Sequence, residues 1–329
     1  MEYINDAGTI NLNCYLQNSI NALDIYKYTN PQHFEDNIPV NILFDDSLRE
    51  IYNIHNQKYN PVIVQPIPLQ IQSNKKVLLA FSGGLDSVYQ AFILRESYDV
   101  TLFHVKNMNY YTNGKEYQVC EKFSKTYNFP IVYAQFKQNT KNNTYKKYWK
   151  ENSFKNLLLY SMMLDYCIDN TISNISSGDD LRLDIKDAVV GTNIADAFQV
   201  TLPFMKRIKE YYNIDFIPTN GNIDKAQRIQ KLKEYNALDM FYSCVNPGRF
   251  NQSNHNRINK KYNIQMEKWN CGVCRKCAFH SLLRYYYLHK NYPQEFIDFC
   301  WEKICVGADY EFFKPSLPME QRIKNLIEY

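Results

Sequence analysis

The amino-acid sequence predicts an α/β protein built on a doubly wound parallel sheet, and three observations lead to this prediction. An apolar run at residues 77–81 is typical of a short buried strand, and a glycine-containing turn and a helical pattern follow it directly. From residue 76 onward, strand and helix patterns alternate, as they do where helices join the parallel strands of one sheet. The chain has 329 residues, 45% of them hydrophobic and 22% charged, which suffices for one large core or two modest ones.

Each element after residue 76 is predicted from its own pattern. Strands are expected at 77–81, 100–105, 129–136, 188–190 and 216–218. Helices are expected from about residue 87 and at 115–127, 154–168, 278–288, 292–304 and 317–327, with another opening at 224–226. Doubly wound sheets bind ligands at the carboxyl ends of their strands, which directs attention to the turn after residues 77–81.

Residues 1–74 precede this alternation, and their apolar pattern is broken. Helical patterns occur at 22–28 and 47–54. Pro61, Pro66 and Pro68 require an extended chain at 61–68, as an edge strand or a connector. We expect this region to be a structural cap over an edge of the sheet. The alternative is a docking surface for a partner protein.

The turn after the first strand, called the 82–87 loop below, carries the strongest functional signal. It consists of Ser82, Gly83, Gly84, Leu85, Asp86 and Ser87. A strand, a glycine turn and a helix in this order aim backbone N–H groups and the positive end of a helix dipole at one point. The glycines allow an anion to approach the main chain, and Asp86 stands where a carboxylate could hold Mg²⁺ against phosphate oxygens. The spacing is not that of a Walker loop. The alternative is an ordinary turn after a buried strand.

The 82–87 loop resembles the PP-loop of the ATP pyrophosphatase family, which includes tRNA thiolases, asparagine synthetases and QueC-like 7-cyano-7-deazaguanine synthases. The resemblance implies that MgATP is split between its α and β phosphates, that pyrophosphate stays on the loop, and that AMP is placed on a substrate. It also implies that all six loop residues contact the nucleotide.

Further residues match QueC-like proteins. The helix at 154–161 looks like their helix that opens with Arg-Asn, with Lys155 in place of the arginine. Lysine is a point charge and cannot make the same two-pronged contact. Gly191 and Asp196 match a Gly-x-Asn-x-x-Asp pattern, for which an Asx turn that caps the next helix is the alternative. Lys225 lies where the family has Thr-Lys-Ala, and it either meets a phosphate or faces water. The resemblance thus implies Asp86, Lys155, Asp196 and Lys225 as catalytic residues and Gly191 as a contact to ATP.

The cysteines indicate a metal site. Nine cysteines in a chain without a secretion signal favour metal binding over disulfides. Cys271, Cys274 and Cys277 form a Cys-x-x-Cys-x-x-Cys run, and Cys244 precedes it. Four thiolates satisfy a tetrahedral Zn²⁺ ion with no open position, which is typical of a structural site. An iron–sulfur cluster uses the same ligands, and a redox Cys-x-x-Cys is a further alternative. The arrangement is similar to the zinc signature of QueC-like enzymes.

The resemblance divides the chain into an accessory region (1–74), a PP-loop domain (75–240), a zinc module (241–290) and a C-terminal helical tail (291–329). It implies ATP, Mg²⁺ and Zn²⁺ as cofactors and a deazaguanine acid as substrate. Segments 107–111 and 197–204 depart from the family's substrate-recognition segments, and 245–270 is an insertion beside the cysteines. These departures put the substrate in question and leave the adenylation chemistry intact.

Four functions remain open. The first is adenylation of 7-carboxy-7-deazaguanine and its conversion with ammonia to 7-cyano-7-deazaguanine. The second is a relative from a phage-defence operon that joins the acid to an amine of a protein or nucleic acid. A tRNA thiolase and a non-catalytic zinc and nucleotide module are the third and fourth.

Charge and composition bear on whether the chain binds nucleic acid or a membrane. A net charge of +4 does not by itself argue for a nucleic-acid partner. One segment, residues 137–155, is rich in lysine and aromatic residues. We expect it to form either a lid over ATP or a contact to a polynucleotide. No apolar run is long enough to span a bilayer, and the first residues lack a signal peptide, so a cytoplasmic location is expected.

Overall fold

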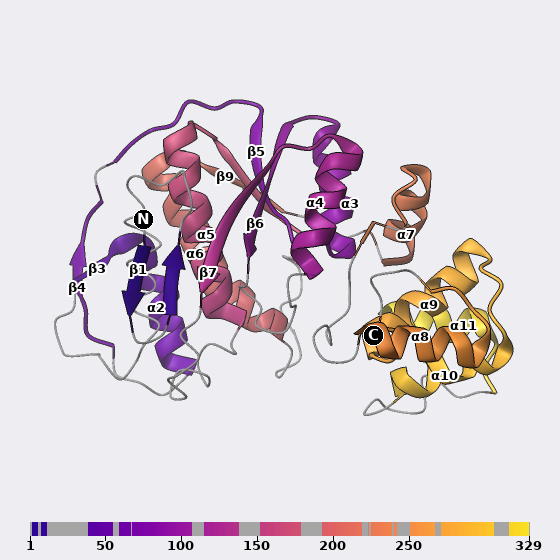
Figure 1. The fold of residues 1–329 in the computed structure, drawn as a ribbon. Helices are drawn as coiled ribbons and strands as arrows, with labels where there is room; N and C mark the ends of the chain where they lie inside the picture. The colour runs from indigo at the N-terminus through magenta and orange to yellow at the C-terminus, as the bar shows by residue number, and fades with distance from the viewer. Residues whose placement is uncertain are drawn as a thin grey trace. The chain divides into compact units, whose positions relative to one another are not determined.

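The computed structural model describes most of the chain and divides it into two compact units (Figure 1). Described are residues 2–5, 8–11, 39–54, 59–66, 68–106, 115–137, 152–178, 193–218, 223, 225–238, 240–241, 251–266, 271–305 and 316–328. Unit 1 comprises residues 1–80, 93–108 and 129–219, and unit 2 comprises residues 81–92, 109–128 and 220–329. The domain limits expected from the sequence remain a prediction.

Unit 1 is built on a seven-stranded sheet in the order β1-β2-β7-β6-β5-β8-β9. The strands are β1 (Glu2–Asn5), β2 (Gly8–Asn11), β5 (Lys76–Ala80), β6 (Asp99–Lys106), β7 (Ile131–Lys137), β8 (Asn174–Ser177) and β9 (Asp215–Ile217). The five strands from β7 to β9 pair in parallel, which confirms the predicted doubly wound sheet. The direction of winding reverses between β5 and β8, the switch point where such sheets bind ligands. The 82–87 loop follows β5 in the chain.

Strand β8 is absent from the sequence-based assignment, because it is polar and yet buried. The Asn174 side-chain amide donates to the carbonyl oxygens of Asn74 and Lys76, at 2.9 and 2.8 Å. The Ser176 hydroxyl donates to the Ile217 carbonyl oxygen at 2.7 Å. These bonds offset the desolvation of the polar groups, so the strand needs no apolar run. The strand expected at 188–190 lies outside the described residues.

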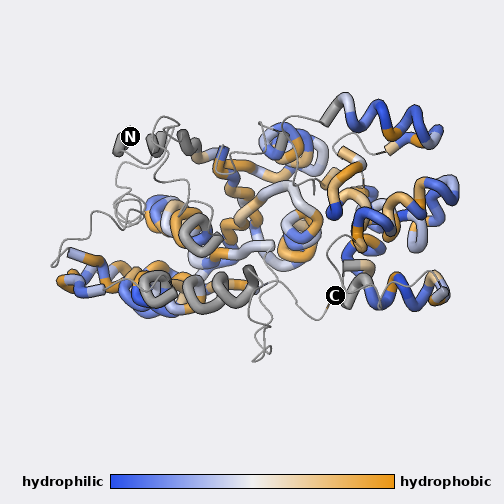
Figure 2. The backbone as a smooth tube through the Cα atoms, turned by 90° about the horizontal axis from the view of Figure 1, so that it is seen from below, coloured by the Kyte–Doolittle hydropathy of each residue, from blue (hydrophilic) through white to orange (hydrophobic). Residues whose placement is uncertain are grey.

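Three helices complete the core of unit 1: α2 (Ile42–Ile54), α5 (Asn152–Asn170) and α6 (Asn193–Tyr212). Helix α2 includes the helical pattern predicted at 47–54. The rings of Phe44 on α2 and Phe204 on α6 are fully buried and stack with centroids 5.3 Å apart. In Figure 2, hydrophobic and hydrophilic residues alternate along the helical coils of the backbone. No described helix combines the length and the apolarity needed to cross a bilayer.

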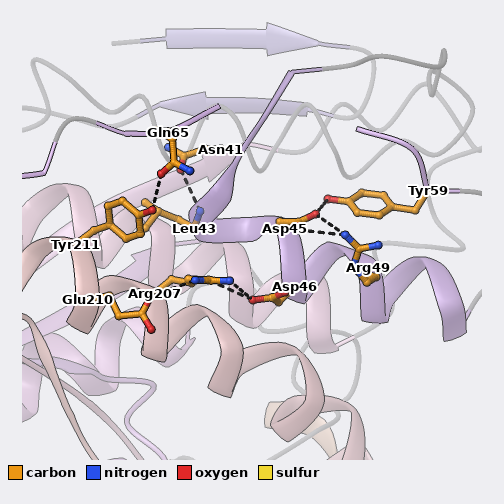
Figure 3. A network of polar contacts seen from close by, with 10 residues as sticks. All are labelled: Asn41, Leu43, Asp45, Asp46, Arg49, Tyr59, Gln65, Arg207, Glu210 and Tyr211. Carbon is orange, nitrogen blue, oxygen red and sulfur yellow. Dashed lines mark hydrogen bonds and ion pairs between the residues drawn. The ribbon is translucent and has the colours of Figure 1, made fainter. Parts of the chain in front are cut away.

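The N-terminal region is an integral part of unit 1. Strands β1 and β2 extend the sheet beyond β7 by antiparallel pairing, so β7 is not an edge. Strands β3 (Pro39–Asn41) and β4 (Val62–Val64) form a small parallel sheet. Arg207 on α6 donates to Asp46 on α2, and Tyr211 donates to Gln65 (Figure 3). The described contacts thus favour the structural interpretation of this region.

Unit 2 contains the beginning of α3 (Leu85–Arg95) and six further helices among its described residues. These are α4 (Lys115–Tyr127), α7 (Lys225–Glu234), α8 (Asn251–Tyr262), α9 (Arg275–Leu288), α10 (Gln294–Cys305) and α11 (Met319–Glu328). Helices α4, α9, α10 and α11 occur where the sequence predicts them. The insertion at 245–270 contains α8. The rings of Phe81 and Phe92 both pack against the ring of Phe123.

Candidate functional site

The 82–87 loop is ordered by its own hydrogen bonds. Gly83 has φ = +72°, a left-handed conformation that glycine adopts at little cost. The Gly84 N–H donates to Ser82 Oγ at 3.2 Å, and Ser87 Oγ donates to the Gly84 carbonyl oxygen at 3.1 Å. The Val88 N–H donates to the same carbonyl at 2.9 Å and begins the bonds of α3. Serine hydroxyls and helix N-terminal N–H groups therefore gather at one turn, as an anion site requires.

Helix α4 lies directly against this loop. A Cβ atom at Gly83 would lie 3.1 Å from Val119 Cγ1 and 3.4 Å from Cys120 Sγ. Gly83 is thus required twice, for its backbone conformation and for the close approach of α4. The sequence motif indicates the first requirement but not the second.

Asp86, in the first turn of α3, is held by an arginine. Arg228 Nη1 on α7 donates to Asp86 Oδ1 at 2.7 Å. The arginine side chain is 1% exposed, and the aspartate side chain is 36% exposed. The structure therefore gives the predicted magnesium-binding carboxylate a fixed partner. Sequence reasoning missed Arg228, although one signal was present: it lies four residues before Leu232, on the face of α7 that buries Ile229 and Leu232.

Three of the four predicted metal ligands come together at the start of α9. The sulfur atoms of Cys271, Cys274 and Cys277 all lie within 4.8 Å of one another, and all three residues are buried. Cys271 Sγ and Cys277 Sγ are 3.8 Å apart. Cys274 caps the helix, since its sulfur accepts from the Cys277 N–H at 3.5 Å. Gly272, at φ = +71°, makes the turn between ligands.

The distance between the sulfur atoms of Cys271 and Cys277 matches that between two thiolate ligands of one tetrahedral ion. Zinc with Zn–S bonds of about 2.3 Å holds its sulfur ligands about 3.8 Å apart. Cysteines that each bind a different iron of a cluster stand farther apart. The three cysteines could bind a metal ion or a cluster, and Cys244 stays the predicted fourth ligand.

The loop and the cysteines share one neighbour. Val119 of α4 packs in the same buried cluster as Cys271, Cys274 and Cys277, and it also lies against Gly83. The cysteine cluster and the 82–87 loop thus contact the same side chain.

Cys120, beside the loop, is not set up as a nucleophile. Burial, followed by the charge of Glu116, raises the pKa of its thiol well above the ordinary value of 9.0. Its Sγ is 3.7 Å from the Phe81 carbonyl oxygen. A thiol that stays protonated at neutral pH is a poor nucleophile, so we assign Cys120 to packing.

The other predicted residues are only partly described. Lys155 lies in α5, Asp196 lies in the first turn of α6, and Lys225 begins α7. Their side chains lie outside the described part of the structure, as do Gly191 and Cys244. Their roles therefore remain predictions.

We compared the chain with known proteins. No protein-family model matches the chain, and no curated protein does. Among solved structures, the chain is similar to the U34-tRNA thiolase NcsA from Methanococcus maripaludis, which was solved with its [4Fe-4S] cluster. The identity is 15%, 79% of this chain and 84% of that chain are covered, and the TM-score is 0.41. At these values, the function has to be argued from the site itself.

Proposed function

We propose that this chain is a PP-loop enzyme that cleaves ATP into AMP and pyrophosphate and adenylates a carboxylate. One observation carries the proposal: the 82–87 loop joins the strand at the switch point of a parallel sheet to the N-terminus of α3. Its conformation, with Gly83 at φ = +72°, gathers N–H and hydroxyl donors at one turn.

The residues of the loop would act by position and charge. The backbone N–H groups and the exposed Ser82 hydroxyl would bind the β and γ phosphates at the positive end of α3. Asp86 would offer a carboxylate oxygen to Mg²⁺, which neutralises phosphate charge when it is bound. The fixed donors need no rearrangement as negative charge develops on pyrophosphate, and this is where their contribution to the rate arises.

For the substrate, the motif matches favour 7-carboxy-7-deazaguanine. Its carboxylate oxygen would attack the α phosphorus, and pyrophosphate would leave. An amine would then displace AMP and form an amide. With ammonia as the amine, a second ATP would activate the amide oxygen, and loss of AMP with the amide protons would give the nitrile. The altered segments 107–111 and 197–204 keep a protein or nucleic-acid amine as an alternative acceptor.

A thiolase is the second candidate, because the cysteine cluster and the loop share Val119. A metal site that close to the nucleotide suits participation in chemistry better than a remote structural site does. Two observations weigh against it: the spacing of the sulfur atoms fits one ion, and burial raises the pKa of Cys120, the described cysteine beside the loop.

The test uses the purified chain with ATP, Mg²⁺, 7-carboxy-7-deazaguanine and ammonium, and follows the products by mass spectrometry. We expect AMP and pyrophosphate, with the acid converted to amide and nitrile. Formation of AMP without nitrile would favour a macromolecular acceptor. Absence of AMP and pyrophosphate with every acid and acceptor tried would contradict the proposal. Asp86→Ala is the inactive control.

Metal analysis separates the two candidates. We expect one zinc ion per chain, lost in Cys274→Ala and retained in Cys167→Ala, whose thiol is buried in unit 1. Iron with acid-labile sulfide would favour the thiolase instead.

A further inference from the structure

Arg228 is a deeply buried charge beside the 82–87 loop. Its side chain is 1% exposed, and it donates to Asp86, 142 positions earlier in the chain, at 2.7 Å. Its guanidinium carbon also lies 5.6 Å from the centre of the Tyr89 ring, which is buried one turn beyond Asp86 on α3. Arg228 on α7 thus contacts two successive turns of the helix that the 82–87 loop opens.

Burial decides what this arginine can do. A guanidinium that is 1% exposed cannot reach a phosphate in this conformation, so it is not a direct ligand for ATP. Burying a charge is costly unless it is paired, and here Asp86 and the face of Tyr89 offset that cost. A buried apolar side chain of similar length would serve packing equally well. The positive charge of Arg228 therefore indicates that its role is to hold the Asp86 carboxylate.

Arg228 donates to one oxygen of the Asp86 carboxylate. Arg228 Nη1 contacts Oδ1, and this charge-assisted bond fixes the rotation of the Asp86 carboxylate. With Oδ1 held from the interior and the side chain 36% exposed, Oδ2 is the oxygen that can reach a cation on the solvent side. A freely rotating carboxylate would have to be ordered each time the cation binds.

We propose that Arg228 is a positioning residue of the nucleotide loop, which holds Asp86 so that its second oxygen receives the Mg²⁺ ion of MgATP. The inference rests on the proposed function, because it needs ATP at the 82–87 loop. Lysine cannot replace Arg228 fully, since its ammonium is a compact point charge and lacks the planar fork of donors with which a guanidinium fixes a carboxylate.

The experiment measures the affinity of the full chain for ATP as a function of Mg²⁺ concentration. A hydrogen bond to a charged group is worth at least about a tenfold change in an equilibrium constant. We therefore expect Arg228→Met to raise the Mg²⁺ concentration for half-maximal ATP binding by about tenfold, and Arg228→Lys to raise it less. The matched control is Lys231→Met on the same helix, whose ammonium forms an exposed pair with Glu234 and should leave the profile unchanged.

A double-mutant cycle separates positioning from a merely structural role. Asp86→Asn keeps an oxygen that can accept from Arg228 but weakens the cation site. If Arg228 acts through Asp86, adding Arg228→Met to Asp86→Asn changes the Mg²⁺ dependence no further. An equal effect of Arg228→Met in both backgrounds, or no effect in the wild-type background, would overturn the inference while leaving the ATP site in place.

If Arg228→Met does not fold, Arg228→Lys completes the same cycle. A wild-type chain that does not bind MgATP would refute the proposed function and this inference together.

Discussion

At the scale of single residues, the 82–87 loop depends on Gly83 for two separate reasons. A Cβ atom would lie 3.1 Å from Val119 Cγ1, and the backbone is left-handed at φ = +72°. We expect Gly83→Ala to cost about 1–2 kcal/mol from backbone conformation alone, with a further steric cost. Chemical denaturation measures the loss of stability. Adding Val119→Ala should relieve the steric part, judged against Val119→Ala alone, and an unchanged stability of Gly83→Ala would show that the loop tolerates a side chain.

The buried thiols predict how stability depends on pH. Burial raises the pKa of Cys120 and Cys167 well above the ordinary 9.0, and it raises the pKa of Cys300 to about 12. Above about pH 9 the unfolded chain releases these protons and the folded chain keeps them, so the unfolded state binds fewer protons and stability falls as pH rises.

Each such thiol contributes a slope of about 1.4 kcal/mol per pH unit in that range. Denaturation at pH 8, 9 and 10 measures the total slope, and Cys167→Ala should reduce it by the share of one thiol. A slope that is the same in both chains would contradict the assignment for Cys167.

The residues themselves show what a sequence can reveal about a site. The 82–87 loop and the Cys-x-x-Cys-x-x-Cys run each lie within one short stretch of the chain, so both motifs can be recognised without a structure. Arg228 meets Asp86 across 142 positions, and Val119 meets the cysteines across a similar span. Such partners are set by tertiary packing, and a single sequence carries no direct signal for them.

At the scale of elements, helices and strands with a clear apolar pattern were predicted from the sequence, and polar ones were missed. Helix α4 was predicted at its observed bounds, because its apolar positions recur at helical spacing and face a core that includes Val119 and Phe123. Strand β8 was missed, because hydrogen bonds rather than apolar contacts compensate for its burial. Strands β1 and β2 were missed as well, since each is short and has few apolar residues.

Helix α4 also predicts a coupling between the metal and the nucleotide. Val119 contacts both Gly83 and the cysteine cluster, so removing the metal should loosen the support of the 82–87 loop. We expect removal of the metal by a chelator to weaken ATP binding by at least about fivefold, the lower end of typical coupling between two sites.

Calorimetry on the loaded and the chelated chain measures this effect. Val119→Ala should reduce the difference between the two forms, and Lys122→Ala on the exposed side of α4 should not. Equal ATP affinity with and without the metal would show that Val119 does not couple the cysteine cluster to the 82–87 loop.

At the scale of the whole molecule, the sequence predicted the parallel sheet and its helices, and it placed the N-terminal 74 residues as a cap over a sheet edge without saying which edge. The sheet order could not be foreseen, because β2 pairs with β7, more than 120 positions later in the chain, and β1 pairs with β2. The region closes an edge of the sheet, supplies α2 to the core, and lies along the end of α6, where the Leu69 and Ile71 N–H groups donate to the Tyr211 and Tyr212 carbonyls. These contacts distinguish a structural part of the fold from a separable docking module.

A deletion tests that distinction. Without residues 1–74, β7 becomes an open sheet edge and α6 loses the apolar side chains of α2, so we expect an insoluble or unfolded product. Two point variants on α2 refine the test. Phe44→Ala removes a fully buried ring that stacks on Phe204 and should cost about 3–5 kcal/mol, measured by chemical denaturation. Asp46→Ala removes only a surface ion pair with Arg207 and should cost less than about 1 kcal/mol. A soluble, cooperatively folded chain that begins at residue 75 would instead mean that the region is dispensable for folding and serves a partner.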